Sequence, residues 1–224
     1  MSDSTAALLP VLKAGLRDMG LDLEADTSKR MLTYLSEFHK WNKAYNLSAV
    51  RDLDAMVHRH LLDSLSVLPR VSARSPGRLI DVGTGGGLPG IPLAIALPDC
   101  QVTLLDSNGK KTRFLFHIKT LLGLDNVQVE NRRVEAFAPE VPYDLVISRA
   151  FASLADMVDG CAHLVAPEGI FMAMKGLYPE HELAAVADRV ALLASHPLRV
   201  PGTEGERHLL ELALKQGEAI VPGR

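Results

Sequence analysis

Glycines and one acid between positions 78 and 92 are the residues whose types and spacing most clearly indicate chemistry. The segment reads RLIDVGTGGGLPGIP, in which Asp81 follows a short apolar run and Gly83, Gly85 and Gly87 come at alternate positions after it. Glycines between a strand and a helix let the chain turn sharply, and they leave backbone N–H groups open to a ligand at the positive end of the helix. The segment therefore predicts a binding loop for a nucleotide-like ligand.

The acid before the glycines distinguishes between two cofactors. Residues 85–90 also form a Gly-x-Gly-x-x-Gly string, which occurs in NAD-binding proteins. However, Asp81 would repel a pyrophosphate, whereas it attracts the ammonium end of S-adenosylmethionine, directly or through water. No Gly-Lys-Ser/Thr follows the glycines, which excludes a P-loop. We therefore expect S-adenosylmethionine as the cofactor.

Two further positions fit this cofactor. Asp106 ends the next apolar segment, where its carboxylate can accept hydrogen bonds from both ribose hydroxyls, a use that NAD proteins share. After the third apolar segment, Val134 and Glu135 are placed to contact the adenine. An acid that caps a helix is an ordinary alternative role for Glu135.

The spacing of apolar residues predicts helices and strands that alternate after residue 77. Such alternation is typical of a mostly parallel sheet covered by helices on both faces, and the last two strands, with no helix between them, fit an antiparallel hairpin at the edge. Residues 71–77 have the composition of a loop, so we expect an N-terminal helical region over 1–76 and a cofactor-binding domain over 77–224. Expected helices span residues 5–19, 28–47, 52–68, 91–96, 110–122, 153–164 and 179–193, and expected strands 79–80, 101–106, 126–130, 143–149, 170–175, 198–200 and 207–215.

Composition narrows the class of protein. The net charge of −3 over 224 residues is not that of a general nucleic-acid binder, so any RNA contact must use a local basic surface. No apolar run is long enough to cross a bilayer and the first ten residues lack the pattern of a leader, so we expect a cytoplasmic protein without membrane contact. Cys100 and Cys161 are far apart in the chain, which predicts buried free thiols and no metal site.

The ordered motifs closely resemble one family, the bacterial 16S rRNA guanine-N7 methyltransferases, also called glucose-inhibited division protein B. The matching segments cover nearly the whole chain, and Leu-Pro-Gly-Ile-Pro and Ser-Arg-Ala-Phe-Ala are far more specific than the glycines. A departure is Gly86, where we expect proline or alanine in many relatives; because the backbone binds the ligand, it casts little doubt on the cofactor. The segments are KWNKAYNL (40–47), RHLLDS (59–64), DVGTGGGLPGIP (81–92), LLDS (104–107), ISRAFA (147–152), KG (175–176) and GERHL (205–209).

The resemblance implies a fold, a substrate and a set of residues. The fold is the Rossmann-like one of class I S-adenosylmethionine-dependent methyltransferases, with a seven-stranded sheet that has an antiparallel edge strand. The substrate is guanine 527 in the 530 loop of 16S rRNA, free or within a small ribosomal subunit, and we expect the enzyme to act as a monomer. The cofactor contacts carried over are Gly83, Leu88, Val134, Glu135 and Arg149, in addition to Asp81, Gly85, Gly87 and Asp106.

The chemistry of guanine N7 sets what the other residues must do. N7 has an available lone pair and needs no general base, so the enzyme must align it with the methyl group and exclude water. We expect Arg149, Asn46 and His60 to position the guanine, and His60 to be able to pair with Asp63 one helical turn away. The expected RNA contacts are Lys175 and Arg207 near strand ends, and Arg132, Arg133, Lys110, Lys111 and Arg113 as outer phosphate contacts, although each outer residue alone is more typical of a solvated surface charge.

Two other functions remain open at this point. The same scaffold also serves methyltransferases that act on small molecules or proteins, because a fold does not determine its substrate. A non-enzymatic RNA-binding accessory protein that senses the cofactor would carry the same loop. Transfer of methyl groups to rRNA distinguishes these functions.

Overall fold

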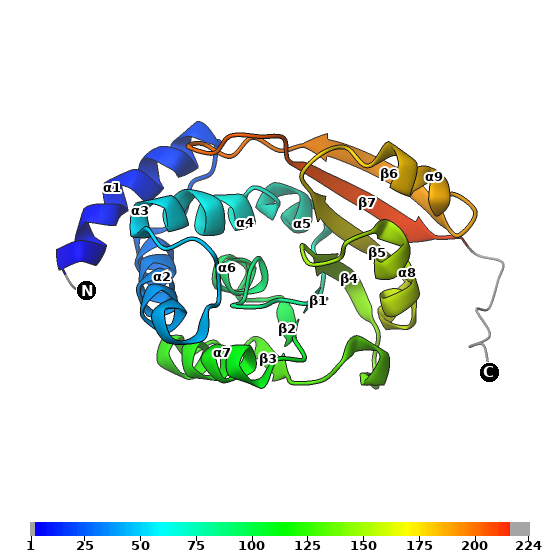
Figure 1. Cartoon of the computed structure of the whole chain (residues 1–224), viewed down its shortest axis with the longest axis horizontal. Coiled ribbons are helices and arrows are strands. Elements are labelled where there is room, and N and C mark those ends of the chain that lie inside the picture. The colour runs from blue at the N-terminus through cyan, green and yellow to red at the C-terminus, as the bar shows by residue number, and fades with distance from the viewer. Residues whose placement is uncertain (1–2, 216–224) are drawn as a thin grey trace.

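The computed structural model describes residues 3–215 of the chain, with side chains from residue 7 onward. Its centre is one seven-stranded sheet covered by helices on both faces (Figure 1). The expected α/β fold class is therefore confirmed. The strands are β1 (Arg78–Val82), β2 (Gln101–Leu105), β3 (Val127–Glu130), β4 (Tyr143–Ser148), β5 (Val165–Lys175), β6 (Val190–Pro197) and β7 (His208–Leu214).

The strand order places the ends of the first four strands side by side. The order is β3-β2-β1-β4-β5-β7-β6, and β3, β2, β1, β4 and β5 are parallel. The antiparallel strand is β7, which lies one position in from the edge and pairs with both β5 and β6. Because parallel strands end at the same edge, the loops after β1 to β4 form one continuous row.

The helices follow the apolar spacing of the sequence. In α1 the side chains of Leu8, Leu12 and Leu16 are buried, and in α2 those of Leu35 and Phe38 are fully buried. The α-helices are α1 (Asp3–Asp18), α2 (Ala25–Tyr45), α3 (Leu53–Met56), α4 (Asp63–Leu65), α5 (Leu68–Arg74), α6 (Gly90–Ala96), α7 (Gly109–Leu122), α8 (Leu154–Cys161) and α9 (Glu180–Ala185); η1 (Val57–Leu62) is a π-helix, and η2 (Val134–Ala136) and η3 (Ala162–Leu164) are 3-10 turns.

Two hydrophobic clusters lie on the two faces of the sheet. Leu79 and Ile147 point into one cluster with α1, α2, α6 and α7, whereas their neighbours Ile80 and Val146 point into the other with α8. This alternation is the period of two of a strand whose faces are both buried. Figure 1 shows α1, α2 and α3 on the left, α4 and α5 across the upper middle, and α8 and α9 on the right. The N-terminal helices thus share a core with the sheet.

The expected helix over residues 179–193 is wrong in its second half. Helix α9 ends at Ala185, and Val190 begins β6, which pairs with β7 over its whole length. Sheet pairing here overrides a helix-like apolar spacing, since seven of the eight residues of β6 pair with β7. The strand expected over 198–200 is consequently displaced, because these residues follow β6.

The expected third helix and the loop after it also differ from the structure. The helix expected over 52–68 contains the π-helical turn Val57–Leu62, a form that a helical apolar period does not reveal. Helix α5 covers residues 68–74 and so replaces the first half of the loop expected over 71–77, because Val71 is fully buried in the core; Ser75, with a φ of 45°, caps the end of this helix. The division of the chain at residue 76 stays a prediction, and residues 1, 2 and 216–224 of the two proposed parts lie outside the described range.

Both cysteines are buried free thiols, as expected. Burial raises the pKa of the Cys100 thiol to about 11 and that of Cys161 to about 12, so both stay protonated at neutral pH. Within residues 3–215, no helix is both long and apolar enough to pass through a membrane.

Candidate active site

The structure brings the expected cofactor residues to the row of loops at the carboxyl edge of the sheet. The glycine loop follows β1, Asp106 follows β2, Val134 and Glu135 follow β3, and Arg149 follows β4. These four strands are neighbours in the order β3-β2-β1-β4. Residues that are up to 68 positions apart in sequence therefore line one continuous edge, which is where open α/β sheets bind ligands.

The loop after β1 has a backbone that suits a ligand. Gly85 and Gly87 adopt φ values of 61° and 95°, which side chains rarely allow, so glycine is required at both positions. The loop then enters α6 at Gly90. Leu88, an expected cofactor contact, is only 5% exposed and belongs to the hydrophobic core.

Asp81 lies directly under this loop and is fully buried. Its Oδ2 accepts hydrogen bonds from Thr84 Oγ1 at 2.6 Å and from the Gly90 amide at 2.8 Å. Its Oδ1 is buried and has no partner among the described residues. Burial raises the pKa of Asp81 to about 6 despite these two bonds. A buried acceptor without a donor is rare in proteins, and it fits a loop that is completed by a ligand cation or by water.

Asp106 is held in place at the tip of β2. Its Oδ2 accepts from the Gly85 amide at 2.9 Å and its Oδ1 from the Asn108 amide at 2.8 Å. The Lys111 ammonium lies 3.9 Å from Oδ2, so this expected RNA contact is instead beside the cofactor row. Each carboxylate oxygen retains a further lone pair for a hydroxyl donor, which suits a ribose.

Val134 and Glu135 occupy the 3-10 turn after β3. Val134 is half-buried and packs on the cluster of α8, whereas Glu135 is exposed. Glu135 caps no described helix with its side chain, so nothing in the structure favours the alternative role considered for it.

Helix α2 supports the glycine loop from the opposite side, which the sequence analysis did not reveal. The Tyr34 hydroxyl donates to the Gly86 carbonyl at 2.7 Å, and a Cβ placed on Gly86 would lie 2.3 Å from Phe38 Cε2. Tyr34 and Phe38 are fully buried. Gly86 is therefore the only residue that fits against Phe38, which explains the departure from the proline or alanine expected here.

Asp63 pairs with two arginines and not with His60. Its Oδ2 accepts from Arg149 Nη1 at 2.9 Å and its Oδ1 from Arg207 Nε at 3.1 Å. The expected pair of His60 and Asp63 is thus wrong, because both carboxylate oxygens face guanidinium groups, which are always charged. An acid among buried leucines was the available sign that Asp63 needed strong partners.

His60 and Asn46 lie in different surroundings. The His60 ring is 4% exposed, packs 5.1 Å from the Phe38 ring between centroids, and has no hydrogen-bond partner for either nitrogen among the described residues. Burial lowers the pKa of His60, so the ring is neutral at neutral pH. Asn46 is exposed at the end of α2, where its Oδ1 accepts from Arg51 Nη2 at 2.6 Å. No side-chain hydrogen bond joins His60 to Asn46 in the part of the chain that the structure describes.

A cavity of about 630 Å³ opens beside Arg149, at the ends of β4 and β5. Lys175 lines it, but its ammonium is paired with Glu182 at 2.8 Å and the side chain is only 12% exposed. Exposed Tyr178 also lines the cavity. Lys175 therefore has less charge free for RNA than its place in the sequence indicated.

The basic residues expected as outer phosphate contacts differ in whether they form ion pairs. Arg132 is 3.4 Å from Glu130, whereas Lys110, Arg113 and Arg133 are exposed and form no ion pair within residues 3–215. These last three remain the free positive charges of the expected set.

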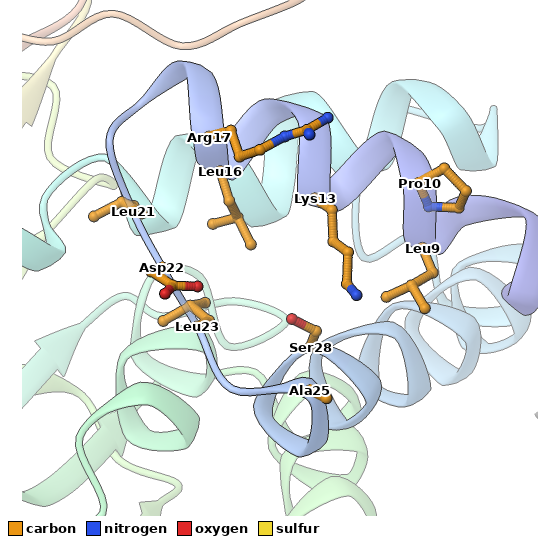
Figure 2. A pocket seen from close by; sticks show the side chains of 10 residues that line it. All are labelled: Leu9, Pro10, Lys13, Leu16, Arg17, Leu21, Asp22, Leu23, Ala25 and Ser28. Carbon is orange, nitrogen blue, oxygen red and sulfur yellow. The ribbon is translucent and has the colours of Figure 1, made fainter.

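A second cavity, of about 490 Å³, lies apart from this site. It is formed between α1 and the start of α2, and Figure 2 shows its leucines together with Lys13, whose side chain extends from α1 toward Ser28. None of the expected site residues lines it. Residues 3–215 contain no cluster of three His, Cys, Asp or Glu side chains that could hold a metal ion.

Solved structures share the fold with little sequence identity. TrmN from Thermus thermophilus superposes with a TM-score of 0.55 at 18% identity, over 71% of this chain and 53% of that one. A SAM-dependent methyltransferase from Thiobacillus denitrificans, solved with S-adenosyl-L-homocysteine, has a TM-score of 0.55 at 12% identity, over 80% of this chain and 98% of that one. These similarities confirm the Rossmann-like methyltransferase fold.

Sequence relatives are much closer. The family model GidB, rRNA small subunit methyltransferase G, matches residues 27–210. The ribosomal RNA small subunit methyltransferase G of Cellvibrio japonicus is 62% identical over 95% of this chain and 98% of its own length. Those of Saccharophagus degradans and Pseudomonas aeruginosa are 55% and 52% identical over 88% and 90% of this chain, and over 86% and 93% of theirs. The chain therefore belongs to the GidB family of rRNA small subunit methyltransferases.

Proposed function

We propose that this protein transfers a methyl group from S-adenosylmethionine to N7 of a guanine in 16S rRNA, guanine 527 by family resemblance. Family membership supports an rRNA of the small ribosomal subunit as the substrate, either free or within a subunit particle. We also propose that the enzyme acts as a monomer in the cytoplasm. The choice of N7 rests on the residues after β4.

The segment Ser148-Arg149-Ala150 is the observation that carries this choice. Enzymes that methylate exocyclic amines commonly place Asn/Asp-Pro-Pro-Tyr here to polarise a poor nucleophile. In this chain the Ser148 hydroxyl donates to the Val82 carbonyl at 2.7 Å, and Arg149 carries a fixed positive charge. The nearby carboxylate of Asp63 is engaged by two arginines. The segment therefore offers no free base, which suits N7 because its lone pair is already available.

The residues at the carboxyl edge fit the cofactor part by part. Asp106 can accept both ribose hydroxyls, the unpartnered oxygen of Asp81 can receive the ammonium group directly or through water, and Arg149 can meet the carboxylate. When bound, S-adenosylmethionine would supply an electrophilic methyl group for N7, and its sulfur would keep the electron pair of the bond that breaks. The protein contributes alignment and a dry site, for which the cavity beside Arg149 provides room.

Transfer of a labelled methyl group tests the proposal. Purified protein and S-adenosylmethionine labelled at the methyl group are incubated with 16S rRNA, with small ribosomal subunits, and with a pool of small metabolites and proteins. We expect label in the rRNA, at a single guanine, as 7-methylguanosine. Label on another atom of the base would contradict the choice of N7. Label confined to the metabolite or protein pool, or found nowhere, would overturn the function.

A further inference from the structure

One buried carboxylate joins three segments of the chain at the edge of the proposed site. Asp63 is the first residue of α4, directly after the π-helical turn Val57–Leu62. Its two oxygens accept from Arg149, after β4, and from Arg207, before β7. The Asp63 side chain is 6% exposed, whereas those of Arg149 and Arg207 are 34% and 31% exposed. The carboxylate is thus hidden, and the two guanidinium groups reach solvent.

The remaining donors of the two arginines are free to bind a ligand. Arg207 Nη1 donates to the Glu206 carbonyl at 2.8 Å, and Arg149 donates to no acceptor other than Asp63 within the described residues. One carboxylate and two guanidinium groups leave a net charge of +1. Charge-assisted bonds also fix the rotamers of two long side chains, which would otherwise lose entropy when they bind a ligand.

The two arginines face different parts of the site. Arg149 directly follows β4, the neighbour of the strand β1 that leads into the glycine loop, and it lines the 630 Å³ cavity. Arg207 lies on the segment before β7, which is two strands beyond β4 in the sheet order, and it does not line this cavity. Arg149 is therefore placed to bind an oxyanion of the cofactor, and Arg207 to bind a phosphate of the RNA backbone.

We propose that Asp63 is a positioning residue that aims Arg149 at the carboxylate of the cofactor and Arg207 at a phosphate of the rRNA. The inference rests on the proposed function. It makes cofactor binding and RNA binding depend on one side chain that touches neither ligand.

The test compares Asp63→Asn, which keeps the shape and removes the charge, with Arg207→Gln. Calorimetry gives the Kd for S-adenosylmethionine without RNA, and methyl transfer at saturating cofactor gives KM and kcat for 16S rRNA. We expect Asp63→Asn to raise both the Kd and the KM about tenfold, and Arg207→Gln to raise the KM alone. A change in only one constant, or in neither, for Asp63→Asn would overturn the shared role.

Glu211→Gln is the matched control. Glu211 is also buried, accepts from Arg74 at 3.0 Å and from His196 at 2.9 Å, and lies within β7, away from the site. We expect both constants to stay unchanged in this variant. If they rise as much as in Asp63→Asn, the effect comes from lost stability and the proposal is wrong.

A second variant covers the case in which Asp63→Asn does not fold. The double variant Asp63→Asn/Arg207→Gln restores the net charge of +1 and is compared with Arg207→Gln alone. A Kd for the cofactor about tenfold higher in the double variant supports the proposal, and an equal Kd overturns it. Because this comparison needs no RNA, it stands even if wild-type protein fails to methylate 16S rRNA, which would refute the proposed function instead.

Discussion

Replacing Asp81 by Asn should remove a pH dependence that burial of this carboxyl creates. Burial raises its pKa from the ordinary value of 3.8 to about 6. Between these values the folded protein holds a proton that the unfolded chain has released. Asp81 therefore contributes stability that is complete below pH 3.8 and is lost as the pH rises through about 6. The rise of the pKa from 3.8 to about 6 corresponds to about 3 kcal/mol in the free energy of unfolding.

Thermal unfolding without cofactor measures this contribution. For a chain of this length, about 3 kcal/mol corresponds to a change in Tm of roughly 6–12 °C. Because the unfolded carboxyl is already mostly ionised at pH 4.5, about 2 of these 3 kcal/mol are lost between pH 4.5 and 7.5, so we expect the Tm of wild type to fall by roughly 4–8 °C relative to Asp81→Asn over this range. Asp106 and Arg149 are present in both proteins, so the difference isolates Asp81. Parallel Tm curves would refute the raised pKa.

The same carboxyl should make cofactor binding depend on pH. If the ionised form receives the ammonium group, the affinity of wild type for S-adenosylmethionine should rise about tenfold from pH 5 to pH 7 and level off above pH 7. Asp81→Asn should bind more weakly at pH 7 and show no such rise. Calorimetric titrations at each pH provide the measurement. Equal pH profiles in the two proteins would refute the contact with the ammonium group.

Three further substitutions test other parts of the site. Asp106→Ala should weaken cofactor binding by about 1.5–3 kcal/mol, since a charged acceptor of ribose hydroxyls is lost; unchanged affinity by calorimetry would contradict that role. Gly86→Ala should destabilise the protein by about 1–3 kcal/mol, because the new Cβ would lie 2.3 Å from the Phe38 ring. Adding Phe38→Leu to this variant should recover part of the lost stability, as measured by thermal unfolding. If the effects of the two substitutions on stability are strictly additive, the clash is excluded. Asn46→Ala should lower guanine-N7 methylation without a change in cofactor affinity; undiminished methylation removes Asn46 from the guanine pocket.

The parts of the fold that the sequence predicted are those with strong local signals. The glycine loop and the acids after β1 and β2 could be placed because a parallel sheet brings strand ends to one edge, whatever the details of packing. Strand β6 could not, because Val190–Pro197 becomes a strand only through its pairing with β7. The π-helical turn was likewise hidden, since one extra residue in a turn leaves the apolar period almost unchanged.

The contacts that hold the site together were harder to predict than its position. Tyr34 and Phe38 have the spacing of ordinary core residues, and their contact with Gly86 joins positions about 50 residues apart. The partners of Asp63 come from residues 86 and 144 positions away, so sequence proximity favoured His60 instead. Such long-range polar pairs depend on tertiary geometry, which local spacing does not encode.

Mass spectrometry of 16S rRNA tests most directly the proposal that this protein methylates a guanine at N7. Digested 16S rRNA is compared from cells that contain the protein, cells that lack it, and cells that carry the Arg149→Ala variant. We predict 7-methylguanosine at one guanine of the 530 loop with wild type, and its loss in the other two. The same content of 7-methylguanosine with and without the protein would contradict the account.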